Sequence, residues 1–306
     1  MDSASMDPAG IADFIASSVR FCVPILCACL AGLWSERAGV VDIGLEGKLL
    51  AAAFAGAAVA SLTGSAALGL GAAVGASLTL ALVHGYASID RGGDQIVCGM
   101  AINMIALGAT AFAGAAIFGE GGRTPALAGA ARFEPAFGGH DLITWSAFAC
   151  VAATMFIVFH TRFGLRLRAA GENPQALEAA GVPVRRVRYG AVAVCGLLCG
   201  LGGADLSLAQ AAGFLPGMSA GKGFIALAAL VFAKWRPGAA LVVCLAFGGL
   251  EAAAIRLQGV SIAGIGQAPV QAIQALPYLL TVILLAGFVG RARAPAAAGV
   301  PFTRDR

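Results

Sequence analysis

The chain has 306 residues, and 59% of them are apolar even before its 43 glycines are counted. Soluble proteins reach only about 45–50% with glycine included, and the charged share of 12% is about half of the usual one. This composition excludes a disordered chain and argues strongly against a soluble enzyme, which could not cover so much apolar surface. The net charge of +4 is too small to indicate a nucleic-acid partner. A polytopic membrane protein is the class that remains.

Apolar stretches long enough to span a bilayer recur along the whole chain. A spanning helix needs about 20 mostly apolar residues, so the sequence predicts one all-α transmembrane domain over residues 1–306 with about 9 spans, within roughly 8 to 10. The seventh stretch is short and is expected to be either a span or a re-entrant or broken helix. The first stretch lacks a basic leader and is expected to be retained. The expected spans are 13–33, 43–62, 66–89, 95–118, 141–161, 188–211, 219–233, 237–256 and 273–290.

The basic residues indicate the orientation of these spans. If the C-terminal arginines lie in the cytoplasm, four loops become cytoplasmic and hold most of the other Arg and Lys residues, as positive-inside bias requires. These loops are 34–42, 90–94, 162–187 and 234–236. We therefore expect a multi-pass protein of the bacterial inner membrane with a cytoplasmic C-terminus. Arg20 and Lys222 are expected to reach the outer interface.

The loop 162–187 contains the pattern of a short helix with two defined ends. Asn173 suits an N-cap and Pro174 the first helical position, whereas Gly181 suits a left-handed C-terminal cap and Pro183 stops continuation. The sequence predicts a helix over about 174–180, outside the membrane, which is marginal alone. It is either a docking element for a partner or a solvated connection. The side chains expected to be available for docking are an apolar knob, Leu177, with Gln175 and Glu178 beside it.

Polar residues near or within the apolar stretches are the candidates for a translocation pathway. The segment 35–48 is either a cytoplasmic turn with Glu36 and Arg37 paired, or irregular chain that dips into the bundle. Polar groups at bilayer depth are costly and indicate either a pathway or hydrogen bonds between helices. The pathway candidates are Asp42, Glu46, Asn103, Asp205, Gln210 and Glu251.

The sequence holds no pattern that predicts catalysis. The Gly-Lys-Gly run at 221–223 lacks the earlier glycine and the following Ser or Thr of a phosphate-binding loop. The eight cysteines lie in apolar runs without paired spacing, and only three histidines are available, so packing is their expected role. We expect no catalytic residue, no metal and no cofactor bound by this chain. If ATP powers transport, another subunit must hydrolyse it.

Four segments taken together resemble a known family. They are SERAGVVDIGLEGKLL (35–50), DQIVCGMAINMIALG (94–108), TRFGLRLRAAGENPQALEAAGV (161–182) and GKGFIALAALVFAKWRPGAAL (221–241). In this order, across most of the chain, they resemble permease subunits of bacterial ABC importers of the ribose and branched-chain amino-acid type, and within these the simple-sugar and nucleoside branch. Asp42 stands where the nucleoside branch usually has Asn and ribose-type permeases commonly have Asp. Ala233 stands where Gly is common.

The resemblance implies partners and a coupling site. It implies a homodimer or heterodimer of permease subunits in the lipid bilayer, two cytoplasmic ABC ATPases that hold ATP and Mg, and an extracytoplasmic substrate-binding protein. It also implies that the helix near 174–180 is a coupling helix seated in a groove of the ATPase. The implied coupling residues are Gly171, Glu172, Asn173, Pro174, Gln175, Leu177, Glu178 and Gly181.

The expected function is inward movement of a small neutral polar solute by ATP-driven alternating access. A neutral solute is expected because the predicted spans carry few charges to pair with an ionic one. A purine nucleoside is the favoured substrate, and a simple sugar such as ribose is the alternative. A further alternative is a secondary transporter working without ATP, in which Asp205 and Glu251 would be proton-coupling sites.

Overall fold

Long apolar helices make up most of the chain. The computed structural model describes residues 8–119, 121–258, 261–262, 266–267, 275, 279 and 293–302. Within them, seven helices are long and apolar enough to cross a membrane, which confirms the all-α polytopic bundle. These helices are α1 (Pro8–Arg37), α2 (Leu45–Thr63), α3 (Ala66–Gly85), α4 (Gln95–Phe118), α5 (Leu142–His160), α8 (Val184–Ala204) and α10 (Pro237–Leu257). They correspond to the expected spans other than the seventh and ninth.

Shorter elements connect or extend these helices. Single π-helical turns lengthen α3 and α8, and a two-residue antiparallel pair follows α10. The shorter elements are η1 (Tyr86–Asp90), η2 (Gly129–Ala131), α6 (Arg162–Glu172), α7 (Pro174–Ala179), η3 (Asp205–Gln210), α9 (Lys222–Phe232), β1 (Ser261–Ile262) and β2 (Gly266–Gln267). The ninth expected span, 273–290, lies outside the described residues apart from positions 275 and 279.

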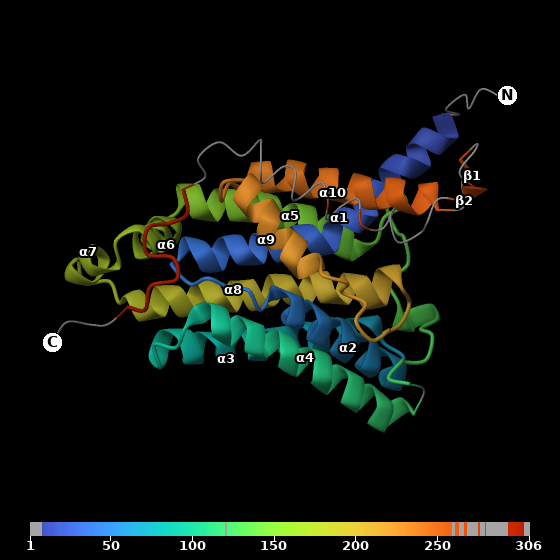
Figure 1. Ribbon diagram of the computed structural model, residues 1–306, viewed down its shortest axis with the longest axis horizontal. Helices are drawn as coiled ribbons and strands as arrows, with labels where there is room; N and C mark the ends of the chain where they lie inside the picture. Colours follow the sequence, from blue (N-terminus) through green and yellow to red (C-terminus); the bar gives the residue numbers. More distant parts are fainter. Residues whose placement is uncertain are drawn as a thin grey trace.

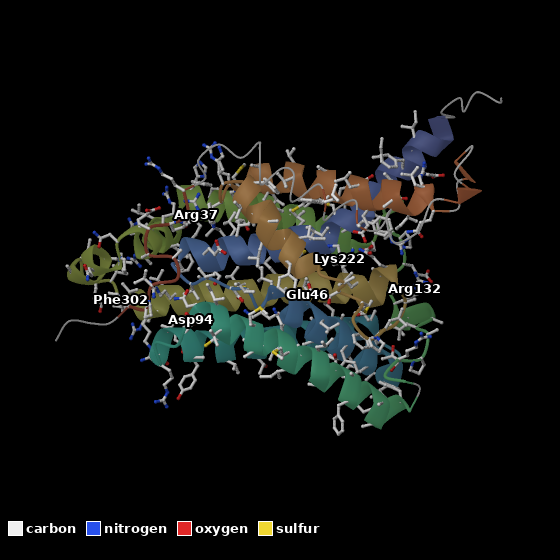
Figure 2. The ribbon with its side chains drawn as sticks, viewed as in Figure 1. Arg37, Glu46, Asp94, Arg132, Lys222 and Phe302 are labelled. Carbon is white, nitrogen blue, oxygen red and sulfur yellow. The ribbon has the colours of Figure 1, made fainter. Side chains whose placement is uncertain are left out.

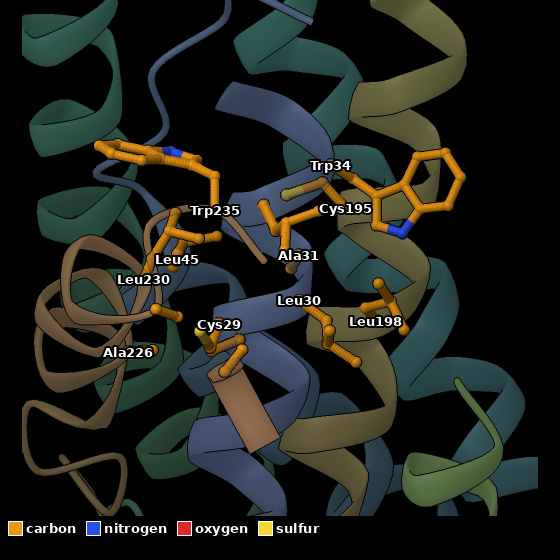
Figure 3. Packing of buried hydrophobic residues seen from close by; sticks show 14 of the residues in the cluster. Cys29, Leu30, Ala31, Trp34, Leu45, Cys195, Leu198, Ala226, Leu230 and Trp235 are labelled. Atoms are coloured by element: carbon orange, nitrogen blue, oxygen red, sulfur yellow. The ribbon is translucent and has the colours of Figure 1, made fainter. Parts of the chain in front are cut away.

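Helices α1 and α8 run through the middle of the bundle. Helix α10 packs along α1, and α2 and α3 pack along α8, with α4 against α2 (Figure 1). The two central helices bring Leu30, Trp34, Cys195 and Leu198 into one buried cluster (Figure 3). The Trp34 indole donates a hydrogen bond of 3.1 Å to the Thr154 hydroxyl, because a buried N–H needs a partner.

Glycines on α8 allow the neighbouring helices to approach closely. A Cβ at Gly203 would lie 2.5 Å from the Ala52 Cβ and from the Leu49 carbonyl oxygen of α2. A Cβ at Gly200 would lie 2.6 Å from the Val74 Cα of α3. Small residues are favoured at such contacts in lipid because dispersion and packing, rather than the hydrophobic effect, hold the helices together.

The seventh expected span is a broken crossing. Residues 211–221 are not helical, and α9 that follows has only 11 residues, which is about 16 Å or half of the hydrocarbon core. Its C-terminal end meets the end of α1, where the Arg37 side chain donates to the Trp235 carbonyl oxygen. Helix α9 therefore begins near the middle of the membrane and ends at the same face as α1.

The two ends of the bundle differ in charge. Figure 2 orients the two ends: Arg37 lies toward the end that carries α6 and α7, together with Asp94 and Phe302. Arg132 lies at the opposite end. The arginines of α6, with Arg185 and Arg186 after it, also belong to the α7 end. This segregation matches the one that the sequence predicts.

We expect Gly203→Val to destabilise the protein, because the larger side chain has no space between α8 and α2. Overpacking of this kind costs about 1–3 kcal/mol. The matched control is Gly71→Val, since a Cβ at Gly71 meets nothing within 4 Å. Thermal midpoints of the detergent-solubilised protein, followed by fluorescence-detected size exclusion, should fall for Gly203→Val alone. Equal midpoints for the two variants would contradict the close α8–α2 contact.

Candidate functional site

Glu46 connects the start of α2 to the start of α9. Its Oε1 accepts hydrogen bonds from the Ser219 hydroxyl at 2.6 Å and from the Gly221 N–H at 2.8 Å. Its Oε2 accepts from the Gly223 N–H at 2.7 Å. One carboxylate thus satisfies orphan donors at the N-terminus of α9, where the helix dipole also favours negative charge. Figure 2 shows Glu46 and Lys222 near each other in the middle of the molecule.

Asn103 of α4 fixes the turn that leads into α2. Its side-chain oxygen accepts from the Gly47 N–H at 2.7 Å, and its amide nitrogen donates to the Ile43 carbonyl oxygen at 3.0 Å. A Cβ at Gly47 would lie 2.8 Å from the Asn103 Cα, so only glycine allows this approach. Asn103 therefore holds Gly47, the residue next to Glu46, and both Asn103 and Glu46 are predicted pathway residues.

The structure places Lys222 and Glu251 in one ion pair that joins α9 to α10. Lys222 is 8% exposed. The expectation that Lys222 extends to an interface is wrong, because its side chain is buried and its ammonium group is paired with Glu251 inside the bundle. Glu251 and Glu46 thus both bind the start of α9, Glu251 through the Lys222 side chain and Glu46 through the Gly221 and Gly223 N–H groups. Asn103 binds the Gly47 N–H beside Glu46.

The far end of α9 is held by the last residues of α1. Lys234 and Trp235 both have positive φ, at 50° and 53°, a conformation that costs a non-glycine residue about 1–2 kcal/mol. The strain is held by three contacts: the Trp235 indole donates to Glu36 at 2.6 Å, and Arg37 donates to the Trp235 carbonyl oxygen at 3.1 and 2.6 Å. Glu36 and Arg37 each bond to Trp235, so the alternative in which they pair with each other is not what is found.

Asp42 lies in a fully buried polar cluster. Its carboxylate forms an ion pair with Lys48, and both side chains have no exposed surface. The same carboxylate accepts from the Gly44 N–H at 3.0 Å and the Cys195 thiol at 3.2 Å, with His84 Nδ1 at 3.4 Å. Within the segment 35–48, residues 38–44 are the irregular part between α1 and α2, and most of them are buried in the bundle, in agreement with the second of the two alternatives.

Asp205 and Gln210 form a separate pair in η3, the π-helical turn at the C-terminal end of α8. Gln210 donates from Nε2 to Asp205 Oδ2 at 2.6 Å and to the Arg20 carbonyl oxygen at 2.8 Å. Arg20 in turn donates to the Gln210 carbonyl oxygen at 2.7 Å. This pair ties α8 to α1 and is distinct from the cluster around Glu46.

The predicted helix in the loop 162–187 is present as α7. Asn173 caps it by accepting from the Ala176 N–H at 3.0 Å, Pro174 occupies the first turn, and Gly181 has a φ of +81°. Glu178 accepts from the Val184 N–H at 2.8 Å and so connects α7 to the start of α8.

Leu177 does not point outward. It is 7% exposed and packs in the main buried cluster with Leu167 and Val184, so the expectation of an exposed apolar knob is wrong. A helix of six residues has no core of its own, and its one large apolar side chain is used to fix it to the bundle. The exposed face of α7 carries small and polar residues instead: Gln175, Ala176, Ala179 and Ala180.

The α6–α7 segment also contacts the end of α1 and the C-terminal segment of the chain. A Cβ at Gly171 would lie 2.3 Å from the Arg37 carbonyl oxygen, so the end of α6 rests on the end of α1. The C-terminal segment lies across this junction: the Ala297 N–H donates to the Gly171 carbonyl oxygen at 2.8 Å, and the Ala296 N–H to Glu172 at 3.4 Å. Glu172, Asn173 and Gly181 are exposed.

Sequence reasoning missed Ser219, His84 and the role of Trp235. Ser219 and His84 are single polar residues without a motif, and only the fold brings them to Glu46 and Asp42. The strained turn at Trp235 has no sequence signal, because glycine usually marks a positive φ and this position holds tryptophan. Within the described ranges, no group of three His, Cys, Asp or Glu residues is arranged to hold a metal.

Comparison with known proteins assigns this architecture. Residues 14–288 match a family described as the permease component of the branched-chain amino acid transport system. The chain belongs to this family. It is a permease subunit of an ABC importer and a multi-pass membrane protein, not an enzyme, and such permeases work with an ATPase and a substrate-binding protein. The family resemblance seen in the sequence is confirmed.

Three relatives align over nearly the whole chain. The guanosine ABC transporter permease protein NupQ of Bacillus subtilis is 37% identical, over 95% of this chain and 97% of its own. The nucleoside ABC transporter permease protein NupC of Lactococcus lactis is 32% identical, with the same coverage of 95% and 97%. A Haloferax volcanii protein provisionally named as glucose ABC transporter permease protein TsgC13 is 32% identical, over 90% of this chain and 91% of its own.

We expect Lys48→Met to destabilise the permease, because it leaves the buried Asp42 carboxylate without its counter-ion. Removing one partner of a buried ion pair costs about 3–5 kcal/mol, or ~10 °C of thermal midpoint. The double variant Asp42→Asn with Lys48→Met removes both charges and keeps an oxygen for the Gly44 N–H, so it should recover most of that loss. Thermal midpoints in detergent measure both. A double variant as unstable as the single one would show that Asp42 and Lys48 do not compensate each other.

Proposed function

We propose that this permease imports a purine nucleoside. The observation that carries the proposal is the end-to-end similarity to a permease named for guanosine, supported by the second relative named for nucleosides. The relative named for glucose keeps a simple sugar as the second candidate. Asp42, which the sequence offered in favour of a sugar, has another reason to be an aspartate, because its carboxylate neutralises Lys48.

Charge pairing at mid-depth favours a neutral solute. Glu46 is bound to the N-terminus of α9, and Lys222 is paired with Glu251. The positive groups at this depth are thus matched by the chain's own carboxylates, and an ionic solute would have to displace one of them at a cost. A nucleoside or a sugar needs no such displacement. Asp205, Gln210 and Glu251 remain proposals for pathway residues, with Asp42, Glu46 and Asn103.

The α7 end is proposed to face the cytoplasm, where α7 docks in a groove of an ABC ATPase that holds ATP and Mg. The positive-inside bias supports this orientation. The contacts of α7 support its coupling role: it reaches α8 through Glu178, α6 rests on the end of α1, and α1 holds the far end of α9 through Trp235. A rigid movement of α7 would therefore displace α1, α8 and α9 together. A second permease subunit and an extracytoplasmic binding protein complete the proposed importer.

The exposed face of α7 provides the test of coupling. We expect Ala179→Trp to reduce copurification of the ATPase and substrate-dependent uptake by roughly tenfold or more, as for a clash at the centre of an interface. The matched control is Ala126→Trp, an exposed alanine at the opposite end of the bundle. Leu177→Ala should instead lower the thermal midpoint, since it removes a buried side chain. Normal ATPase association in a folded Ala179→Trp protein would reject α7 as the docking element.

The substrate is tested by uptake of labelled guanosine in cells with and without the gene. We expect gene-dependent uptake that fails when ATP is depleted and that excess adenosine, but not ribose or glucose, suppresses. Uptake of labelled ribose or glucose instead, with none of guanosine, would assign the sugar class. Uptake that persists without ATP and collapses with a proton uncoupler would identify a secondary mechanism.

A further inference from the structure

A cavity of about 340 Å³ opens at the α7 end of the bundle and is separate from the cluster around Glu46. Helix α7, the start of α8, the turn η1 and the C-terminal segment all contribute to its wall. The residues that matter for its chemistry are Ile89, Glu178, Arg185, Arg186, Arg188 and Phe302. Phe302 lies at this end of the molecule in Figure 2.

Arg188 is the unusual member of this wall. It is 1% exposed, yet its Nε and Nη2 atoms have no hydrogen-bond partner. Its remaining contacts are a 3.4 Å hydrogen bond from Nη1 to the Val300 carbonyl oxygen and the Phe302 ring, whose centroid lies 6.0 Å from the guanidinium carbon. Buried guanidinium groups are ordinarily paired with carboxylates or other acceptors. An orphaned one in the wall of a cavity indicates that an anion belongs there.

The two described carboxylates near the cavity, Asp90 and Glu178, already have partners. Asp90 accepts from Arg185 at 2.6 Å and from the Tyr189 hydroxyl at 2.9 Å. Glu178 accepts from the Val184 N–H at the start of α8. Arg186 is exposed beside them. The described wall carries three arginines and one glutamate, and Asp90 pairs with Arg185, so arginine is in excess among the described residues here.

The depth of the cavity indicates which anion fits. Asp90 is the last residue of one candidate span and Val184 the first of another, so the cavity lies where the hydrocarbon core meets the headgroup region. On the membrane side, the adjoining turns of α3 and η1 expose Leu82, Val83 and Tyr86. A ligand that places a phosphate among the arginines and acyl chains along α3 suits both surfaces.

We propose that this cavity binds the phosphate headgroup of an acidic phospholipid, with Arg188 and Arg186 as the phosphate ligands. An arginine that only extends to the interface is ordinarily exposed. Arg188 differs because it is buried and two of its donors are unused. The lipid would stabilise the junction of α7, α8 and the C-terminal segment. This inference needs neither the nucleoside substrate nor the cytoplasmic orientation, because both leaflets offer headgroups.

The test uses the full importer in mild detergent, stripped of lipid and then titrated with phosphatidylglycerol, phosphatidylcholine or inorganic phosphate. We expect phosphatidylglycerol alone to be retained in native mass spectra and to raise the thermal midpoint of the permease. Arg188→Gln and Arg186→Gln should each weaken the apparent affinity for phosphatidylglycerol by about tenfold, because each removes a charge-assisted hydrogen bond. The control is Arg162→Gln, in the first turn of α6.

Three outcomes would overturn the proposal. Protection by inorganic phosphate equal to that by phosphatidylglycerol would assign a free phosphate instead of a lipid. Equal affinity of phosphatidylcholine would remove the role of negative charge. Unchanged phosphatidylglycerol affinity in Arg186→Gln would remove the arginine site, and this exposed residue can be replaced without disturbing the interior should Arg188→Gln fail to fold.

Discussion

The bilayer supplies no hydrogen-bond partners, and the centre of this protein depends on how that constraint is met. Helix α9 begins in the middle of the membrane, where its first N–H groups would otherwise be unsatisfied. Glu46 satisfies them from the first turn of α2, and Asn103 holds the turn that leads into that helix. The broken crossing can therefore exist because two neighbouring helices supply the acceptors and donors that lipid lacks.

Polar contacts hold both ends of α9, and this makes α9 the element best suited to change position between two states. Its N-terminus is bound to α2 by one carboxylate, and its C-terminus is bound to α1 through the strained Trp235 turn. Polar anchors of this kind can be exchanged for others, whereas glycine-mediated contacts such as Gly203 against α2 leave no space for adjustment. A movement that reaches α1 from α7 would thus act on α9 more readily than on the α2–α8 contact. This separation of rigid and exchangeable contacts suits alternating access.

Individual residues show how far sequence reasoning reached. The helix at 174–179, its Asn173 cap and its Gly181 terminus followed from local rules, because capping depends on residues a few positions apart. The direction of Leu177 did not follow, since a six-residue helix exposes or buries its apolar face according to what lies beneath it. The burial of Lys222 did not follow for a related reason. Hydropathy identifies an apolar stretch, but it does not show that the chain before α9 is non-helical.

The sequence by itself determined the membrane class, the positions of the seven long helices and of α7, the concentration of arginine at one end and the transporter family. These properties depend on composition, on 20-residue hydropathy and on short local patterns, all of which are written along the chain. Only the tertiary structure decided that Glu46 meets Gly221 and Gly223, that Asp42 pairs with Lys48 against Cys195, and that Arg188 lies buried without an acceptor. Most of those partners are over a hundred residues apart, and a polar side chain in an apolar sequence does not reveal which distant group will satisfy it.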